Sequence, residues 1–284
     1  MTAANCKKAC VIGWPITHSR SPLIHGYWLK TYGIEGTYTK DAVRPEELDN
    51  FLATLGTRGL AGCNVTVPHK EAAFAIAHFK EPSAIAVGAA NTIWLQGSEI
   101  ACANTDTYGF MTNLNLAAPQ WRDGAGPILV LGAGGSARAI VYGFLDAGVR
   151  DVRVFNRSAG RSTALVRHFG TSVSAHAWDS IAAHIPAASM IVNTTTLGMK
   201  GNPDLNLDLT AAKPACVVAD LVYVPLETPL LRRARQRGLA AVDGLGMLLH
   251  QAVPGFEKWF AVRPDVTAEL RALVAADIAA ASGC

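Results

Sequence analysis

The sequence has little that would bind a metal ion. Its six cysteines include no CxxC pair, and its eight histidines form neither an HExxH motif nor a Cys/His cluster with zinc spacing. We therefore expect no bound metal. Scattered cysteines of this kind are typical of reduced thiols, mostly small core residues, so we also expect a cytoplasmic protein.

Strong net charge and long apolar runs are also missing. The net charge is only +3 and 17% of the residues are charged, so nothing global indicates a nucleic acid or an acidic lipid as partner. The densest basic stretch, Arg232–Arg237, is typical of a solvated helix face. The apolar run after Lys7 and Lys8 breaks at Pro15, which argues against a signal peptide or a membrane span. The oligomeric state is left open between monomer and homodimer.

Alternating strand-like and helix-like stretches fill most of the chain. Half of the residues are apolar, as in a well-packed protein. Expected strands cover residues 9–13, 36–41, 62–67, 91–95, 99–103, 128–131, 152–155, 190–193, 217–221 and 240–242. Expected helices cover residues 22–32, 45–55, 69–79, 107–117, 246–260 and 264–281, with further helical segments between the strands from residue 128 to residue 242. The alternation predicts an α/β protein with helices on mostly parallel sheets, a new unit from about residue 106 and another change after residue 243.

A glycine-rich turn follows the expected strand at 128–131. The residues ILVLGAGGSARA place Gly132, Gly134 and Gly135 between this strand and a helix, with Ala137 in the third glycine position. Such a turn lets the backbone approach a pyrophosphate, and the helix N-terminus supplies N–H groups to it. This context favours a dinucleotide-binding domain, although a glycine-rich turn without a ligand remains the alternative.

The end of the next strand indicates which dinucleotide binds. An NAD site places Asp or Glu there, whereas this strand runs into Asn156, Arg157 and Ser158, with Arg161 close behind. Asp151 lies at the wrong end of the strand. A guanidinium can pair with a 2′-phosphate that a carboxylate would repel, so we expect NADP(H). The alternative is that Arg157 is an ordinary solvated loop residue.

Polar residues gather at the ends of the strands in the first third of the chain. Ser19 and Ser21 precede a helix at Pro22 and would suit a carboxylate, although either could be an ordinary N-cap. Thr66, Lys70, Asn91 and Asp106 fall at the ends of expected strands, where open α/β sheets bind ligands.

Lys70 and Asp106 are the obvious lysine and carboxylate of that set. Reducing a ketone requires a hydride on carbon and a proton on oxygen, and an ammonium can donate that proton. By itself, however, Lys70 could equally be a solvated lysine in a first helical turn.

Taken together, the motifs resemble the shikimate dehydrogenase family. The matching stretches, in the family's order, are GWPITHSRSP (13–22), NVTVPHK (64–70), GAANT (88–92), NTD (104–106), GAGGSARA (132–139), NRS (156–158), NTTTLGM (193–199), DLVYVP (220–225) and DGLGMLLHQA (243–252).

The resemblance implies reversible reduction of 3-dehydroshikimate to shikimate with NADPH, a step of aromatic amino-acid biosynthesis. It implies that Lys70 is the acid/base group, paired with Asp106, and that Ser19 and Ser21 hold the carboxylate. It further implies contacts to the substrate from Asn64, Thr66, Asn91, Asp106, Tyr223 and Gln251. The implied NADP site is Gly132, Ala133, Gly134, Gly135, Ser136, Ala137, Asn156, Arg157, Ser158, Thr194, Met199, Leu221 and Gly244.

The family fold implies two domains. Residues 1–105 and 244–284 would form the substrate-binding and catalytic domain, to which the C-terminal helices return, and residues 106–243 would form a Rossmann-type NADP domain. Two departures concern Gly26, where the family often has Asn, and Thr107–Tyr108, where it usually continues with glycine. The second puts substrate breadth and rate in question.

Three other functions compete. A broader quinate/shikimate dehydrogenase would favour NAD and an acidic residue in place of Arg157. A methylenetetrahydrofolate dehydrogenase would lack the paired serines and the set of Lys70 and Asp106. A non-catalytic NADP-binding regulator would be expected to have lost one of those two residues.

Overall fold

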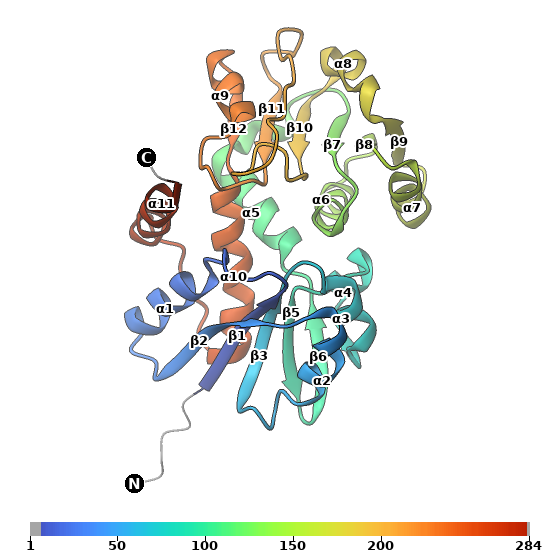
Figure 1. Ribbon diagram of the computed structural model, residues 1–284. Coiled ribbons are helices and arrows are strands. Elements are labelled where there is room, and N and C mark those ends of the chain that lie inside the picture. The colour runs from blue at the N-terminus through green and yellow to red at the C-terminus, as the bar shows by residue number, and fades with distance from the viewer. Residues whose placement is uncertain (1–6, 283–284) are drawn as a thin grey trace. The chain divides into compact units, whose positions relative to one another are not determined.

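The protein has two compact units, each with its own sheet. The computed structural model describes residues 7–282. The first unit takes the described residues of Met1–Asp106 together with Gln251–Val274, and the second takes Thr107–His250 with the described residues from Ala275 onward. Each unit has a six-stranded sheet with helices beside it (Figure 1). The predicted α/β class is confirmed.

The elements alternate along the chain. The first unit contains β1 (Lys7–Gly13), α1 (Ser21–Thr31), β2 (Gly36–Ala42), η1 (Pro45–Glu47), α2 (Leu48–Ala53), β3 (Leu60–Val65), α3 (Lys70–Ile76), β4 (Phe79–Lys80), α4 (Pro82–Val87), β5 (Thr92–Gln96) and β6 (Glu99–Ala103). Next come α5 (Asp106–Ala117), η2 (Pro119–Arg122), β7 (Ile128–Leu131), α6 (Gly135–Asp146), β8 (Val152–Asn156), α7 (Ala159–Phe169), β9 (Val173–Ala177), η3 (Trp178–Ser180), α8 (Ile181–His184), η4 (Ile185–Ala187), β10 (Met190–Asn193), β11 (Val217–Asp220), α9 (Pro229–Gln236) and β12 (Ala240–Val242). Helices α10 (Gly244–Phe260) and α11 (Ala268–Ser282) contribute residues to both units.

The first sheet is mixed, with the order β2-β1-β3-β5-β6-β4. Strand β1 runs parallel to β2 and β3, and β5 and β6 form an antiparallel hairpin. Aromatic side chains from α1, β2 and α10 pack against one another, among them Trp28, Tyr38 and Trp259. Gly62 of β3 lies under this cluster, because a Cβ there would come within 2.2 Å of Trp259 Nε1. Only glycine fits this close approach.

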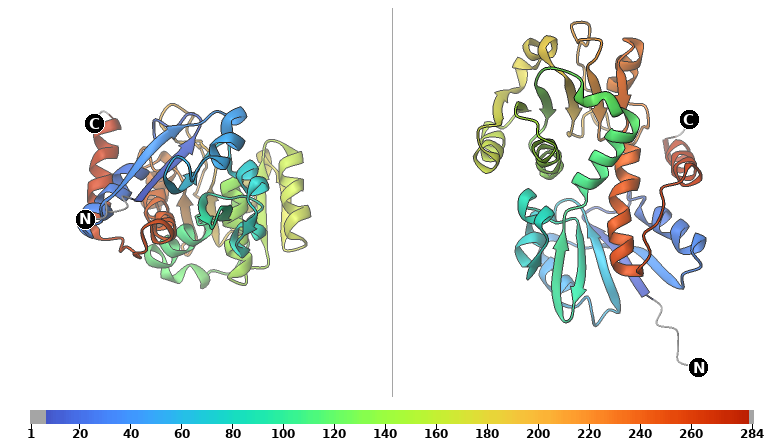
Figure 2. Two further views of the ribbon diagram at one scale, coloured as in Figure 1. Left: turned by 90° about the horizontal axis from the view of Figure 1, so that it is seen from below. Right: turned by 180° about the vertical axis from the view of Figure 1, so that it is seen from behind.

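The second sheet is wholly parallel, with the order β12-β11-β10-β7-β8-β9. This is the doubly wound arrangement of dinucleotide-binding domains, with its switch point between β7 and β10. The central strand β7 is buried along its whole length, which explains why Ile128–Leu131 is an uninterrupted apolar run. Phe110 and Leu114 of α5 pack on one face with Val130, and Figure 2 shows α5 beside this sheet in its right-hand view.

Some predicted elements differ from the structure. The predicted helix over 69–79 is wrong beyond Ile76, because Ala77 turns extended and Phe79–Lys80 pairs with β6. The predicted strand over 62–67 ends at Val65. Helix α4 and strand β9 were not predicted from the sequence, and the predicted start of α11 is too early.

Candidate active site

A lysine and an aspartate of the first unit form an ion pair at the ends of its strands. Lys70 begins α3 shortly after β3, and Asp106 follows β6 at the start of α5. Lys70 Nζ donates a hydrogen bond to Asp106 Oδ2, and the two side chains are only 16% and 7% exposed. Shielding from water strengthens such a pair compared with one on the surface. The ammonium is therefore held in one place, where it could donate a proton to a ligand.

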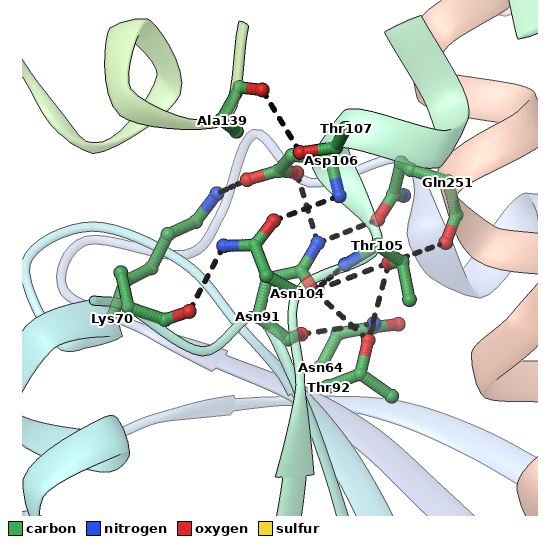
Figure 3. Close-up of polar contacts among 11 residues, drawn as sticks. Asn64, Lys70, Asn91, Thr92, Asn104, Thr105, Asp106, Thr107, Ala139 and Gln251 are labelled. Atoms are coloured by element: carbon green, nitrogen blue, oxygen red, sulfur yellow. Dashed lines mark hydrogen bonds and ion pairs between the residues drawn. The ribbon is translucent and has the colours of Figure 1, made fainter. Parts of the chain in front are cut away.

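Asn91 holds the other oxygen of the Asp106 carboxylate. Its Nδ2 donates to Asp106 Oδ1 at 2.9 Å and to Gln251 Oε1 at 3.4 Å (Figure 3). Its Oδ1 accepts from Thr105 N at 2.8 Å and from the Thr92 hydroxyl at 3.0 Å. Both amide hydrogens already have acceptors, so Asn91 orients Asp106 in this structure.

Asn104 and Thr105, which were not singled out from the sequence, fix the backbone on which Asp106 lies. Asn104 Oδ1 accepts from Asp106 N at 3.1 Å, and its Nδ2 donates to Ala89 O at 3.0 Å. Thr105 Oγ1 donates to Gln251 O at 2.8 Å. An asparagine just before a helix was the available signal, because such residues often bind the first free N–H groups.

Asn64 is oriented by a tyrosine behind it. The Tyr38 hydroxyl donates to Asn64 Oδ1 at 2.6 Å. Asn64 Nδ2 donates to Asn91 O at 3.2 Å and to Thr92 Oγ1 at 3.4 Å. Both donors of the amide are used, so what it can still offer to a ligand hydroxyl is an acceptor lone pair on Oδ1.

A buried histidine supports that tyrosine. The rings of His25 and Tyr38 are stacked, with centroids 3.9 Å apart and planes 6° from parallel. Within residues 7–282, neither ring nitrogen of His25 has a hydrogen-bond partner of acceptable geometry. The nearby Asn64 raises the pKa of His25, but by less than burial lowers it. Burial lowers the pKa of His25 to about 3, so its ring is neutral at physiological pH.

The two serines expected to hold a carboxylate lie at the start of α1. Ser19 Oγ accepts from Ser21 N at 3.3 Å and donates to Ser21 Oγ at 3.2 Å. Ser21 is the first residue of α1, and the preceding Arg20 makes no side-chain capping bond. Neither serine therefore occupies the N-cap position of α1, although Ser19 Oγ accepts from the first N–H of the helix. Thr66 is half-buried beside Gly13, where a Cβ would lie 2.6 Å from Thr66 Cγ2.

The glycine-rich turn of the second unit forms an open cradle. Gly132 has a φ of +108°, and a Cβ there would lie 2.6 Å from Thr194 Oγ1. Gly134 is the N-cap of α6; a Cβ added to it would meet nothing within 4 Å, and no side chain caps the helix. Free N–H groups at this helix start, next to Gly135, Ser136 and Ala137, suit a pyrophosphate. The residues present therefore fit a dinucleotide.

The end of β8 carries no acidic side chain. Asn156 closes the loop by donating from Nδ2 to Ser158 O at 2.9 Å. Arg157 and Arg161 are exposed beside it, and residues 152–161 contain no Asp or Glu. This loop fits a 2′-phosphate better than a free ribose hydroxyl.

The remaining candidate cofactor residues lie on loops after β10 and β11. Thr194 Oγ1 donates to Leu131 O at 2.7 Å, which ties its loop to the end of β7. A Cβ on Gly244 would lie 2.3 Å from Leu221 O. The loop that carries Met199 is joined to the one that carries Tyr223, because Lys200 N donates to Val224 O at 2.9 Å.

Thr107 makes its contacts within the second unit. Its Oγ1 donates to Ala139 O of α6 at 2.9 Å. A Cβ on Gly143 would approach Thr107 Cγ2 to 3.1 Å. The β-branched side chain therefore fastens the start of α5 to α6.

Three family models match the chain. They are the shikimate dehydrogenase substrate binding domain over residues 11–93, shikimate / quinate 5-dehydrogenase over 122–199 and the shikimate 5′-dehydrogenase C-terminal domain over 244–273. A protein of Rhodopseudomonas palustris (strain BisB18), named shikimate dehydrogenase (NADP(+)), is 54% identical over 97% of this chain and 99% of its own. The chain belongs to the shikimate dehydrogenase family. A second such member, from Azorhizobium caulinodans, is 52% identical over 96% of this chain and 98% of its own.

Solved structures of the family have the same fold. The shikimate 5-dehydrogenase of Thermus thermophilus, in complex with NADP(H) and shikimate, is 32% identical with a TM-score of 0.83, over 96% of this chain and 99% of its own. The quinate dehydrogenase of Corynebacterium glutamicum, in complex with NAD, is 27% identical with a TM-score of 0.87, over 95% and 99%. One family fold thus serves both substrates, so the choice depends on particular residues.

Two further observations concern residues 7–282 as a whole. No helix among them is both long and apolar enough to cross a membrane. Nor do they contain a group of three or more His, Cys, Asp or Glu side chains that could hold a metal ion.

Proposed function

We propose that this protein is an NADP-dependent shikimate dehydrogenase, which reversibly reduces 3-dehydroshikimate to shikimate with NADPH in aromatic amino-acid (chorismate) biosynthesis. The observation that carries the proposal is the shielded pair of Lys70 and Asp106, in a chain whose curated relatives have this name. The exposed Arg157 on a loop without a carboxylate supports NADP(H) as the cofactor.

Lys70 is the proposed acid and base. Lys70 Nζ would give a proton to the carbonyl oxygen, which becomes the hydroxyl of shikimate, while bound NADPH would supply the hydride to the carbonyl carbon. In the reverse direction Lys70 takes the proton from that hydroxyl. Asp106 holds the ammonium in place, and Asn91 holds Asp106. A fixed donor of this kind lowers the barrier because it needs no reorientation during the reaction.

The substrate carboxylate would bind to Ser19 and Ser21, whose hydroxyls lie together at the start of α1. Asn64 would accept a hydrogen bond from a ring hydroxyl, as its remaining lone pair allows. The other proposed substrate contacts are Thr66, Asn91, Asp106, Tyr223 and Gln251.

NADP(H) would bind to the second unit. Its pyrophosphate would lie at Gly132–Ala137, where the start of α6 has free N–H groups. The 2′-phosphate would bind to Asn156, Arg157 and Ser158. Thr194, Met199, Leu221 and Gly244 would hold the remaining part of the cofactor.

Three broader statements also belong to this proposal. Residues 1–105 and 244–284 are assigned to a substrate-binding and catalytic domain, and residues 106–243 to an NADP(H)-binding domain. We propose a cytoplasmic location, which is supported by the free thiols of Cys10, Cys63, Cys102 and Cys216. The prediction of a monomer or a homodimer can be checked by light scattering on the purified protein.

Absorbance of the reduced nicotinamide tests the proposal directly. Purified protein is mixed with shikimate or quinate and with NADP or NAD. We expect rapid reduction of NADP by shikimate and little with quinate or NAD. Turnover of quinate with NAD would favour the broader quinate/shikimate dehydrogenase, to which the Corynebacterium glutamicum enzyme is the structural parallel. Binding of NADP without any turnover would favour a non-catalytic regulator.

A further inference from the structure

A buried carboxylate that takes no part in the proposed reaction lies at the end of β11. Asp220 is 1% exposed, and burial raises its pKa to about 6, against hydrogen bonds that lower it. Its Oδ1 accepts from Asn193 Nδ2 at 2.9 Å and from Val222 N at 3.0 Å, and its Oδ2 accepts from Thr228 Oγ1 at 2.7 Å. The three donors are uncharged and belong to three separate segments.

The first segment is the loop after β10. Asn193 is fully buried and also donates from Nδ2 to Leu197 O at 3.1 Å. Its Oδ1 accepts from Thr195 N at 3.0 Å and from Thr195 Oγ1 at 2.7 Å. Asp220 therefore fixes, through Asn193, the loop that contains Thr194 and Met199.

The other two segments flank the loop that contains Tyr223. Val222 N binds the carboxylate directly, next to Leu221. Thr228 is fully buried and is the N-cap of α9, where its Oγ1 accepts from Leu231 N at 3.3 Å. The loop from Leu221 to Thr228 is thus held at both ends by one carboxylate.

We propose that Asp220 is a positioning residue of the cofactor site, which clamps the loops after β10 and β11 in the arrangement that binds NADP(H). The inference rests on the proposed function, because it takes Thr194, Met199 and Leu221 as cofactor contacts. Asp220 itself touches neither substrate nor cofactor in this scheme.

The hydrogen bonds of Asp220 allow the effect of its side-chain contacts to be tested separately from the effect of its charge. Val222 N and Asn193 Nδ2 can only donate, and both bind Oδ1. The Thr228 hydroxyl, bound to Oδ2, can also accept. Asp220→Asn therefore preserves all three contacts, with the new amide donating to Thr228, whereas Asp220→Ala removes all three.

The test is titration of each purified variant with NADP, followed by calorimetry, in the absence of shikimate. We expect Asp220→Ala to raise the Kd for NADP at least tenfold and Asp220→Asn to change it less than threefold. Asp179→Ala, which removes an exposed carboxylate of the same unit, is the matched control. In turnover assays of Asp220→Ala, the KM for NADP should rise while kcat at saturating substrates stays within threefold. A general loss of structure would lower kcat and the fraction of active protein instead.

Thr228 provides a second pair of variants if Asp220→Ala does not fold. Thr228→Val removes one contact and should raise the Kd for NADP, whereas Thr228→Ser keeps the hydroxyl and should restore it. An unchanged Kd in both Asp220→Ala and Thr228→Val, or an Asp220→Asn variant as weak as Asp220→Ala, would overturn the clamp. Wild-type protein that binds NADP but does not oxidise shikimate would overturn the proposed function alone.

Discussion

Asn91 donates a 2.9 Å hydrogen bond to one oxygen of Asp106, while Lys70 donates to the other oxygen of the same carboxylate. The carboxylate cannot rotate without breaking one of these bonds, so the position of the Lys70 ammonium depends on Asn91. This relationship between Asn91 and Asp106 extends the proposed catalytic pair by one residue.

Replacing Asn91 should therefore disturb catalysis through Asp106. We expect Asn91→Ala to lower kcat by about 10- to 100-fold, because small misplacements of catalytic groups have effects of that size. Steady-state kinetics with shikimate and NADP measure this, with Asn50→Ala, an exposed asparagine of α2, as the control. A kcat equal to that of the control would show that Asp106 does not need Asn91.

Lys70→Ala tests the acid and base. Turnover should fall by about 10²- to 10⁴-fold, the usual contribution of such a group, while the Kd for NADP stays unchanged. Lys30→Ala, an exposed lysine of α1, should leave both unchanged. Near-normal turnover of Lys70→Ala would assign the proton transfer to another group.

Arg157→Asp tests which group binds the 2′-phosphate. Loss of a guanidinium and gain of a repelling carboxylate should lower the ratio of kcat/KM for NADP to that for NAD by at least tenfold. The control is Arg167→Asp, an exposed arginine of α7. Equal discrimination in the variant and the wild type would place recognition of the phosphate elsewhere.

His25 should make the protein sensitive to acid. Its folded pKa of about 3 lies below the ordinary value of 6.5, so the unfolded chain takes up the proton first and stability falls as the pH drops from 6.5 towards 3. His25→Phe keeps a ring against Tyr38 without this titration. Urea unfolding should show that the variant gains about 2 kcal/mol relative to wild type between pH 7 and pH 5. A difference between variant and wild type that does not change with pH would contradict the buried neutral state.

Asp220 should have the opposite dependence. Its folded pKa of about 6 lies above the ordinary value of 3.8, so its cost to folding is absent below pH 3.8 and complete above about 6. The arginines of α9 do not offset this charge directly, because Arg232 and Arg235 bind Glu227 and Arg233 binds Leu205 O.

Asp220→Asn should therefore be more stable than wild type at pH 7, by about 3 kcal/mol if all three hydrogen bonds are kept. The gain should disappear towards pH 4 in the same urea series. A variant that is less stable than wild type at pH 7 would mean that charge-assisted hydrogen bonds outweigh the cost of burial.

The family and the fold class could be predicted from the sequence because their signals are local. The strand, glycine turn and helix at Ile128–Asp146 follow one another in the chain, so their order alone indicated a dinucleotide-binding site. Lys70 and Asp106 could be placed at strand ends for the same reason. The apolar pattern wrongly predicted that the helix would continue beyond Ile76. The helix ends there because β4 pairs with β6.

The sequence by itself determined which residue types stand at the ends of which strands, because strand and helix patterns depend on neighbours in the chain. Only the tertiary structure decided how those side chains are oriented. Tyr38 orients Asn64, and Asp220 joins Asn193 to Thr228. The hydrogen-bonding groups of the Asn91 side chain are all occupied, by Asp106, Thr92, Thr105 and Gln251. Most of these partners are far apart in the chain, and a side-chain amide or carboxylate takes its orientation from the partners around it.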